Sequence, residues 1–281
     1  MIEKLKVDRC IALKGLLNMK KYKEYVIENT DKNRIVIVTD IHNCHIEWHE
    51  TPTYDRMELM CKALGEEYDK RKFDGLLSLG DYSLDFWLWD IGGSYLWDNP
   101  VSRTDDFMKR FFDKLPCKMF MIPGNHEQYS NEDWEKITGY PREYVAVYGK
   151  YVFVMLDTFS GGLDPKENHD GVYTGINAEL VQEVLNDYPD KKIILCAHDI
   201  IPIKESEKAR KVIFENNRIV CAFTGHTHRD NTVLLADDWR NLPIFYCGDF
   251  SYNGGHDREK NWGYRIVDFK DGGISTEYIR V

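Results

Sequence analysis

Short apolar runs alternate with amphipathic segments in the first half of the chain. Three runs have the length and content of strands buried on both faces of a parallel sheet: Ile35–Val38, Leu76–Leu79 and Lys118–Ile122. Between them, Tyr54–Arg71 and Asp105–Leu115 place apolar residues at helical spacing. This order of strand, helix, strand, helix and strand predicts an α/β core with a parallel sheet.

The second half predicts further strands, some of them antiparallel. Tyr144–Val147 and Tyr151–Leu156 flank Gly149-Lys150, which is typical of a hairpin turn. The later segments are two helices, Asn177–Tyr188 and Glu205–Asn216, and five strands, Ile193–Ala197, Ile219–Phe223, Ile244–Tyr246, Tyr264–Phe269 and Ser275–Val281. Parallel strands followed by antiparallel ones favour two packed sheets with helices outside.

The chain divides into an N-terminal extension and one domain. Residues 1–33 are charged, and their apolar positions follow no single period. We expect this extension to pack on the core, and a helix is one form that it could take. Residues 34–281 contain no repeat, no low-complexity tract and no linker, which predicts a single domain.

Composition limits the class of protein. The 281 residues include 37 Lys and Arg against 47 Asp and Glu, a formal net charge of −10. That charge argues against non-specific binding to nucleic acid or to anionic membranes. No apolar run approaches the ~20 residues of a membrane helix. The seven cysteines are scattered, and the first ten residues lack a signal-peptide core, so we expect a reduced, cytoplasmic protein.

Polar residues follow five of the predicted strands. They form five short clusters: Asp40 with His42, Gly80-Asp81, Gly124-Asn125-His126-Glu127, His198, and Gly225-His226-Thr227-His228. In α/β sheets, functional groups gather beyond the carboxyl ends of strands. We therefore expect these clusters to meet at one edge.

The side chains in these clusters are of the kinds that bind divalent metals. Carboxylate and amide oxygens together with imidazole nitrogens suit Mn, Fe, Zn or Mg rather than ions that prefer thiolates. If the backbone stays extended, the alternation in Asp40–His42 and in His226–His228 points both donors of each pair the same way. The alternative is a structural role, which would leave many carboxylates and imidazoles desolvated on one rim without compensation.

The five clusters resemble the pattern of the calcineurin-like metallophosphoesterase superfamily: D-x-H, G-D, G-N-H-[DE], H and G-H-x-H, in this order. The resemblance runs from about Arg34 to the last strands. It implies a four-layer α/β/β/α sandwich of two mixed sheets with a two-metal site at the strand ends.

The resemblance also implies a role for each motif residue. Asp40, His42 and His228 would hold the first metal. Asn125, His198 and His226 would hold the second, and Asp81 would bridge both. His126 would face the substrate as general acid, and Glu127 would support the loop.

Such a site implies hydrolysis of a phosphate ester. Two metals about 3.5–4 Å apart lower the pKa of a bridging water and clamp the phosphoryl oxygens, so that the bridging hydroxide attacks phosphorus. Mn²⁺ is the expected ion, with Fe, Zn or Mg as alternatives. The expected substrate is a small phosphodiester or phosphomonoester, for example a nucleotide.

Departures from two subfamilies narrow this expectation. Purple acid phosphatases carry a tyrosine ligand in G-D-x-x-Y, where this chain has Leu84, so an iron–tyrosinate site is not expected. Protein phosphatases carry arginines in two motifs that read Gly80–Phe86 and Pro123–Glu127 here, without either arginine. Asp85 lies one residue from the position that orients the catalytic histidine in that group, which leaves its role open.

Other residues have a functional and a structural interpretation. His45 and His49 follow His42 closely but are typical of loop histidines, whereas His256 could reach the rim of the site. The loop Thr158–Gly175 is expected near the mouth of the site. An aromatic cluster could stack a nucleobase or could pack in the core or at a dimer surface: Phe86, Trp87, Trp89, Tyr95 and Trp97.

Two other functions stay open at this stage. A nuclease acting on DNA or RNA would need a basic groove, and no dense Lys/Arg stripe is present. A non-catalytic scaffold of the same fold would bind protein, although His126 and every expected ligand type are retained. Neither a membrane partner nor a particular oligomeric state is indicated.

Overall fold

Two β-sheets form the centre of the protein. The computed structural model describes residues 20–281 apart from 88–101, 165–169, 236–238, 253–259 and 271. The seven-stranded sheet has the order β1 (Glu24–Val26), β5 (Tyr144–Tyr148), β6 (Tyr151–Leu156), β7 (Lys192–Ala197), β8 (Ile219–Thr224), β10 (Pro243–Tyr246), β9 (Thr232–Leu234). The five-stranded sheet has the order β12 (Ser275–Arg280), β11 (Gly263–Asp268), β2 (Arg34–Val38), β3 (Gly75–Ser78), β4 (Met119–Met121).

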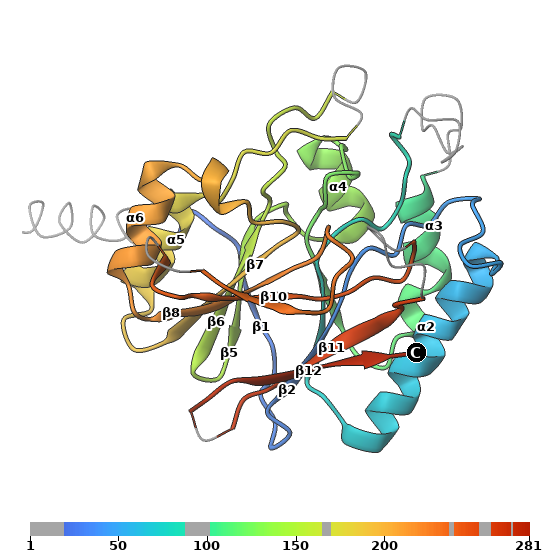
Figure 1. The fold of residues 1–281 in the computed structure, drawn as a ribbon, viewed down its shortest axis with the longest axis horizontal. Helices are drawn as coiled ribbons and strands as arrows, with labels where there is room; N and C mark the ends of the chain where they lie inside the picture. Colours follow the sequence, from blue (N-terminus) through green and yellow to red (C-terminus); the bar gives the residue numbers. More distant parts are fainter. Residues whose placement is uncertain (1–19, 88–101, 165–169, 236–238, 253–259, 271) are drawn as a thin grey trace, which may run out of the picture.

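Helices cover the outer face of each sheet (Figure 1). The α-helices are α2 (Thr53–Arg71), α3 (Arg103–Arg110), α4 (Asn131–Thr138), α5 (Ala178–Asp187) and α6 (Glu207–Glu215), with short 3₁₀ turns at Phe112–Lys114 and Pro202–Lys204. Helices α5 and α6 pack on the seven-stranded sheet, and α2, α3 and α4 pack with the five-stranded one. The predicted four-layer sandwich is thereby confirmed.

Strand β6 shows how the sequence divides the core in two. Val152, Val154 and Leu156 pack with the residues of α5 and α6 on the outside. The alternate residues Phe153 and Met155 join the core that contains the five-stranded sheet. Because successive side chains of a strand point to opposite faces, a continuous apolar run lets β6 be buried on both sides.

Parallel strands direct the functional loops to one edge. Strand β3 pairs in parallel with both β2 and β4 in one sheet, and β7 pairs in parallel with both β6 and β8 in the other. The two sheets meet at these ends, where the His226 N–H donates to Asp40 Oδ2 at 3.0 Å and the Phe250 N–H donates to the Asp40 carbonyl at 3.2 Å.

Three elements were not expected from the sequence. Part of the extension forms β1, which pairs in parallel with β5, while residues 1–19 lie outside the described residues. Strand β9 and helix α4 were also missed. Helix α4 buries only Trp134 and Thr138 fully, so it carries little apolar periodicity. Among the described helices, none is long and apolar enough to cross a membrane.

Candidate metal centre

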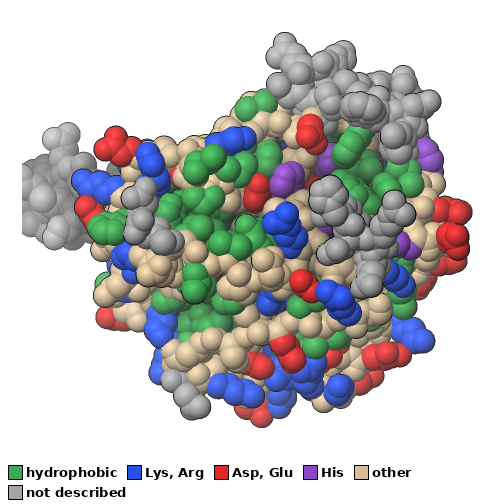
Figure 2. All heavy atoms as spheres, in the orientation of Figure 1, with side chains coloured by type: hydrophobic (Ala, Val, Ile, Leu, Met, Phe, Trp, Pro, Cys, Tyr) green, Lys and Arg blue, Asp and Glu red, His purple; other side chains and the backbone are tan. Residues whose placement is uncertain are grey.

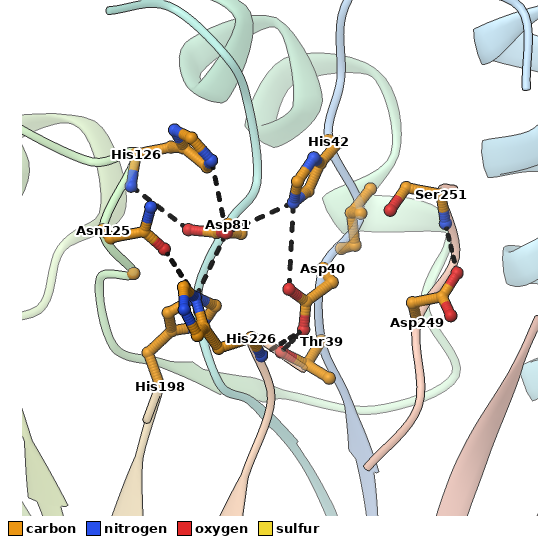
Figure 3. Close-up of polar contacts among 12 residues, drawn as sticks. Thr39, Asp40, His42, Asp81, Asn125, His126, His198, His226, Asp249 and Ser251 are labelled. Atoms are coloured by element: carbon orange, nitrogen blue, oxygen red, sulfur yellow. Dashed lines mark hydrogen bonds and ion pairs between the residues drawn. The ribbon is translucent and has the colours of Figure 1, made fainter. Parts of the chain in front are cut away.

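The loops after β2, β3, β4, β7 and β8 bring the predicted site residues together (Figure 3). All seven predicted ligands are buried except His226, whose side chain is 36% exposed. Their donor atoms fall into two groups with one carboxylate between them. The site therefore lies just inside the surface, with one side open to solvent.

The first group consists of Asp40, His42 and His228. Asp40 Oδ1 lies 3.2 Å from His228 Nε2 and 3.8 Å from His42 Nε2, and one donor atom of each residue lies within 4.8 Å of the others. The His228 Nδ1–H donates to the Tyr252 carbonyl, which leaves Nε2 facing the group, where its lone pair would be available to a cation that displaces the second ring proton. Burial opposes the charge of Asp40, but the neighbouring His228 and His198 hold the pKa of its carboxyl well below the ordinary value.

The second group consists of Asn125, His198 and His226. Asn125 Oδ1 lies 3.0 Å from both His198 Nε2 and His226 Nδ1, and these two nitrogens are 3.3 Å apart. The His198 Nδ1–H donates to the Leu79 carbonyl at 2.7 Å, so a bound cation that displaces the second ring proton would meet the lone pair of Nε2. One amide oxygen and two imidazole nitrogens thus converge on one point.

Asp81 lies between the two groups. Its Oδ2 is 3.2 Å from His42 Nε2 and 3.1 Å from His198 Nε2. Burial alone would raise its pKa, but His198 and His126 hold the pKa of the Asp81 carboxyl well below its ordinary range. Burial likewise opposes a charge on His198, yet Asp81 and Asp40 raise its pKa to about 10. The site therefore favours positive charge strongly.

These donors fit divalent cations. Asp40 Oδ1 is buried without a hydrogen-bond partner and faces the imidazole nitrogens of His228 and His42. Buried polar atoms are normally satisfied, so a concentration of acceptors aimed at one another indicates an ion-binding role. The mixture of carboxylate, amide oxygen and imidazole suits Mn, Fe, Zn or Mg.

His126 stands beside the two groups and belongs to neither proposed ligand set. Its Nε2 lies 3.8 Å from Asp81 Oδ2, and its ring stacks on Trp87 with centroids 4.6 Å apart. Burial, together with the neighbouring histidines, lowers the pKa of His126 to about 3 despite the opposing effect of Asp81. The imidazole is therefore neutral and can present an N–H toward the site.

The chain matches a known protein family over most of its length. A family description of the calcineurin-like phosphoesterases matches residues 33–230, which include all eight predicted site residues. The chain belongs to the calcineurin-like phosphoesterase family. The family description supports a hydrolase that acts on phosphate esters, and the two groups of potential ligands support its dependence on a metal.

Individual relatives of this phosphoesterase are distant. A probable cyclic nucleotide phosphodiesterase from Coxiella burnetii is 26% identical over 174 residues, which cover 57% of this chain and 66% of the relative. A purple acid phosphatase from yellow lupin seeds superimposes with a TM-score of 0.57 at 14% identity, over 93% of this chain and 54% of the lupin chain. GAP50 of Plasmodium, an anchor in the inner membrane complex, superimposes with a TM-score of 0.50 at 12% identity, over 88% of this chain and 84% of that one. Both structures share the fold.

The ligand loops of this phosphoesterase are not extended, contrary to the expectation from alternation. Five of the predicted ligands have positive φ: Asp40 54°, His42 47°, Asp81 57°, His226 61° and His228 55°. Residues with a Cβ adopt this left-handed region at a cost, and such strain is found at functional sites. The donors still converge, because the turns and not the two-residue alternation aim them.

Arg56 of α2 holds one of these turns in place. Its side chain is fully buried and donates hydrogen bonds to the carbonyls of Ile41, His42 and Phe250. The bond to the His42 carbonyl is 2.9 Å long. One guanidinium thus ties the D-x-H loop to the segment that follows β10.

Replacing Arg56 with methionine is expected to lower the free energy of unfolding by about 3 kcal/mol, because three buried carbonyls lose a charged donor. Urea denaturation followed by circular dichroism measures this change. Lys62→Met on the same helix is the control, since Lys62 is 72% exposed. Loss of less than about 0.5 kcal/mol in Arg56→Met would mean that the loop does not depend on this arginine.

Glu127 supports the loops as predicted. Its carboxylate accepts hydrogen bonds from the backbone N–H groups of Asp81, Tyr82, Ser83 and Gly124, at 2.8–3.2 Å. It does not reach the donor groups. A buried carboxylate with four such donors fixes the G-D and G-N-H-E turns relative to one another.

Asp85 does not orient His126. Its carboxylate accepts from the backbone N–H of Arg103 at 2.9 and 3.0 Å and from the Tyr129 hydroxyl. Tyr82 is equally remote, because its hydroxyl donates to the Ser78 carbonyl at 3.0 Å.

Aromatic side chains surround the donor groups. Besides Trp87 on His126, Tyr252 packs against His228 with centroids 4.4 Å apart, and Phe159 against His226 at 5.6 Å. Figure 2 shows histidine side chains at the surface beside hydrophobic ones in the upper half of the view. Of the predicted aromatic cluster, Phe86 packs on Tyr129, and Trp89, Tyr95 and Trp97 lie outside the described residues, as does His256.

The structure adds three residues that the sequence did not single out. Arg56 had one detectable signal, a charge beside the apolar stripe of Met57 and Met60. Asp170 belongs to the loop Thr158–Gly175, which the sequence placed near the mouth of the site without singling out a residue. Tyr252 had no signal, because it lies in a loop without periodicity. His45 and His49 are absent from the groups of potential ligands found among the described residues.

Proposed function

We propose that this protein is a two-metal phosphoesterase that hydrolyses a small phosphate ester, with nucleotides as the expected class. The observation that carries the proposal is the position of Asp81, whose single Oδ2 faces both ligand groups at 3.1–3.2 Å. A carboxylate shared in this way can link two cations. Asp40, His42 and His228 would hold one ion, and Asn125, His198 and His226 the other.

Two divalent ions would supply a water of lowered pKa as nucleophile and charge neutralisation for the phosphoryl group. The chain's own residues supply the rest. Asn125 is a neutral ligand, so it adds no negative charge at the second position. His126 Nε2 faces the same space and can donate a hydrogen bond to the leaving oxygen, a contribution of about 10²–10⁴-fold.

Two observations support a nucleotide or similar substrate. The relative from Coxiella burnetii is described as a probable cyclic nucleotide phosphodiesterase. Trp87, Tyr252 and Phe159 place aromatic rings around the ligand groups, and stacking on such rings suits any nucleobase. The formal charge of −10 favours a small substrate over long nucleic acid.

The direct test is an assay of metal-free protein reloaded with Mn²⁺. Bis(p-nitrophenyl) phosphate and p-nitrophenyl phosphate would be compared side by side, followed by cyclic and linear nucleotides. We expect turnover that requires the metal and that His126→Ala reduces. Absence of turnover on every ester, with two ions bound per chain, would contradict the proposal and favour a binding scaffold.

A further inference from the structure

One acidic side chain reaches the substrate side of the site without belonging to either ligand group. Asp170 Oδ1 accepts a hydrogen bond from Asn125 Nδ2 at 2.8 Å and lies 3.7 Å from His126 Nε2. Its side chain is 65% exposed, so it stands at the mouth and faces solvent. It therefore contacts Asn125 and lies close to His126, the residue that would face the substrate.

The backbone that follows Asp170 in the chain fixes the position of this residue. Gly171 has a φ of 68°, and a Cβ at this glycine would lie 2.8 Å from the Asn125 carbonyl oxygen. The Thr174 N–H donates to the Thr158 carbonyl at 2.8 Å and closes the base of the loop. Close packing of Gly171 against Asn125 thus holds the neighbouring carboxylate at the site.

A phosphoryl or leaving-group oxygen bound there must lie beside this carboxylate. An oxygen that accepts a hydrogen bond from His126 Nε2 lies one hydrogen-bond length from that nitrogen. Its distance from Asp170 therefore exceeds the distance between His126 Nε2 and Asp170 by at most about that length. The Asp170 carboxylate therefore repels a negative charge on this oxygen. Coulomb energy is proportional to the product of the charges, so a dianion is repelled about twice as strongly as a monoanion.

This difference separates two classes of ester. A phosphomonoester has a second pKa near 6 and carries nearly two negative charges at neutral pH. A phosphodiester carries one. We propose that Asp170 is a specificity-determining residue that favours phosphodiesters over phosphomonoesters by charge repulsion at the leaving-group side, an inference that rests on the proposed function.

The variant Asp170→Asn tests the charge separately from the hydrogen bond, because an amide oxygen can still accept from Asn125 Nδ2. We expect kcat/KM to rise about threefold for bis(p-nitrophenyl) phosphate and about tenfold for p-nitrophenyl phosphate. The monoester-to-diester ratio therefore rises about threefold, and less in 0.5 M salt than in 0.05 M salt because of screening. Asp190→Asn, an exposed carboxylate before the start of β7, is the control for loss of one negative charge.

A second readout does not depend on turnover. Calorimetry with Mn²⁺-loaded protein would compare the Kd of inorganic phosphate with that of dimethyl phosphate. In Asp170→Asn the Kd of phosphate is expected to fall more than that of dimethyl phosphate, whereas Asp190→Asn leaves their ratio unchanged.

The outcomes distinguish this inference from the proposed function. The inference would be overturned if Asp170→Asn changed kcat/KM by the same factor for both esters and changed Kd by the same factor for both ligands. This holds whether the values rise or fall. Inactivity of the wild-type protein toward every ester would instead contradict the proposed function, and the binding ratio would still decide the role of Asp170.

Discussion

Asparagine in place of Asp81 is expected to lower kcat for any phosphate ester by at least about 10³-fold. The carboxylate faces His42 and His198 from between the two ligand groups, and the substitution removes its negative charge without changing its size. The groups would then lose their shared ligand. We expect bound Mn²⁺, measured by elemental analysis, to fall from two ions per chain to one or fewer.

A surface carboxylate provides the control for Asp81→Asn. Asp113 is exposed and precedes β4, at the opposite end of that strand from the site. Asp113→Asn should bind two ions and turn over normally. If Asp81→Asn kept two tightly bound ions and a rate within tenfold of the wild type, Asp81 would not be the bridge.

The second large effect is expected for His126→Ala. We expect kcat to fall by about 10²–10⁴-fold while two ions remain bound, because His126 Nε2 faces the site without belonging to a ligand group. The loss should be greater for esters of alkyl alcohols than for p-nitrophenyl esters. An alkoxide needs a proton or a hydrogen bond to leave, whereas p-nitrophenolate is stable by itself.

A series of esters with different leaving groups measures this dependence. His45→Ala is the matched control, an exposed histidine in the loop that follows His42. An equal loss for alkyl and aryl esters would contradict a role at the leaving oxygen. A loss of metal together with the loss of rate would instead make His126 a ligand.

The sequence could predict that these residues would lie close together because of a property of parallel sheets. Runs such as Ile193–Ala197 and Ile219–Phe223 are recognisable by their apolar content, and the carboxyl ends of neighbouring parallel strands share an edge. Polar residues directly after them, such as His198 and His226, could therefore be placed near one another without a structure. The order of the five motifs then narrowed the expected chemistry to the hydrolysis of a phosphate ester.

Features that depend on tertiary contacts could not be predicted. The left-handed turns at Asp40 and His42 are held in part by Arg56, and no propensity of those residues reveals them. Asp170 meets Asn125 across 45 residues of chain, so no local pattern links them. Strand β1 has exposed residues on both sides of Tyr25 and exists through its pairing with β5, which a search for apolar runs overlooks.

The position of the metals tests the central claim most directly. Crystals of the Mn²⁺-loaded protein, measured at the manganese absorption edge, would show the ions by anomalous scattering. The account predicts two peaks about 3.5–4 Å apart, one beside Asp40, His42 and His228 and one beside Asn125, His198 and His226, with Asp81 in contact with both. A single peak, or two peaks without Asp81 between them, would contradict it.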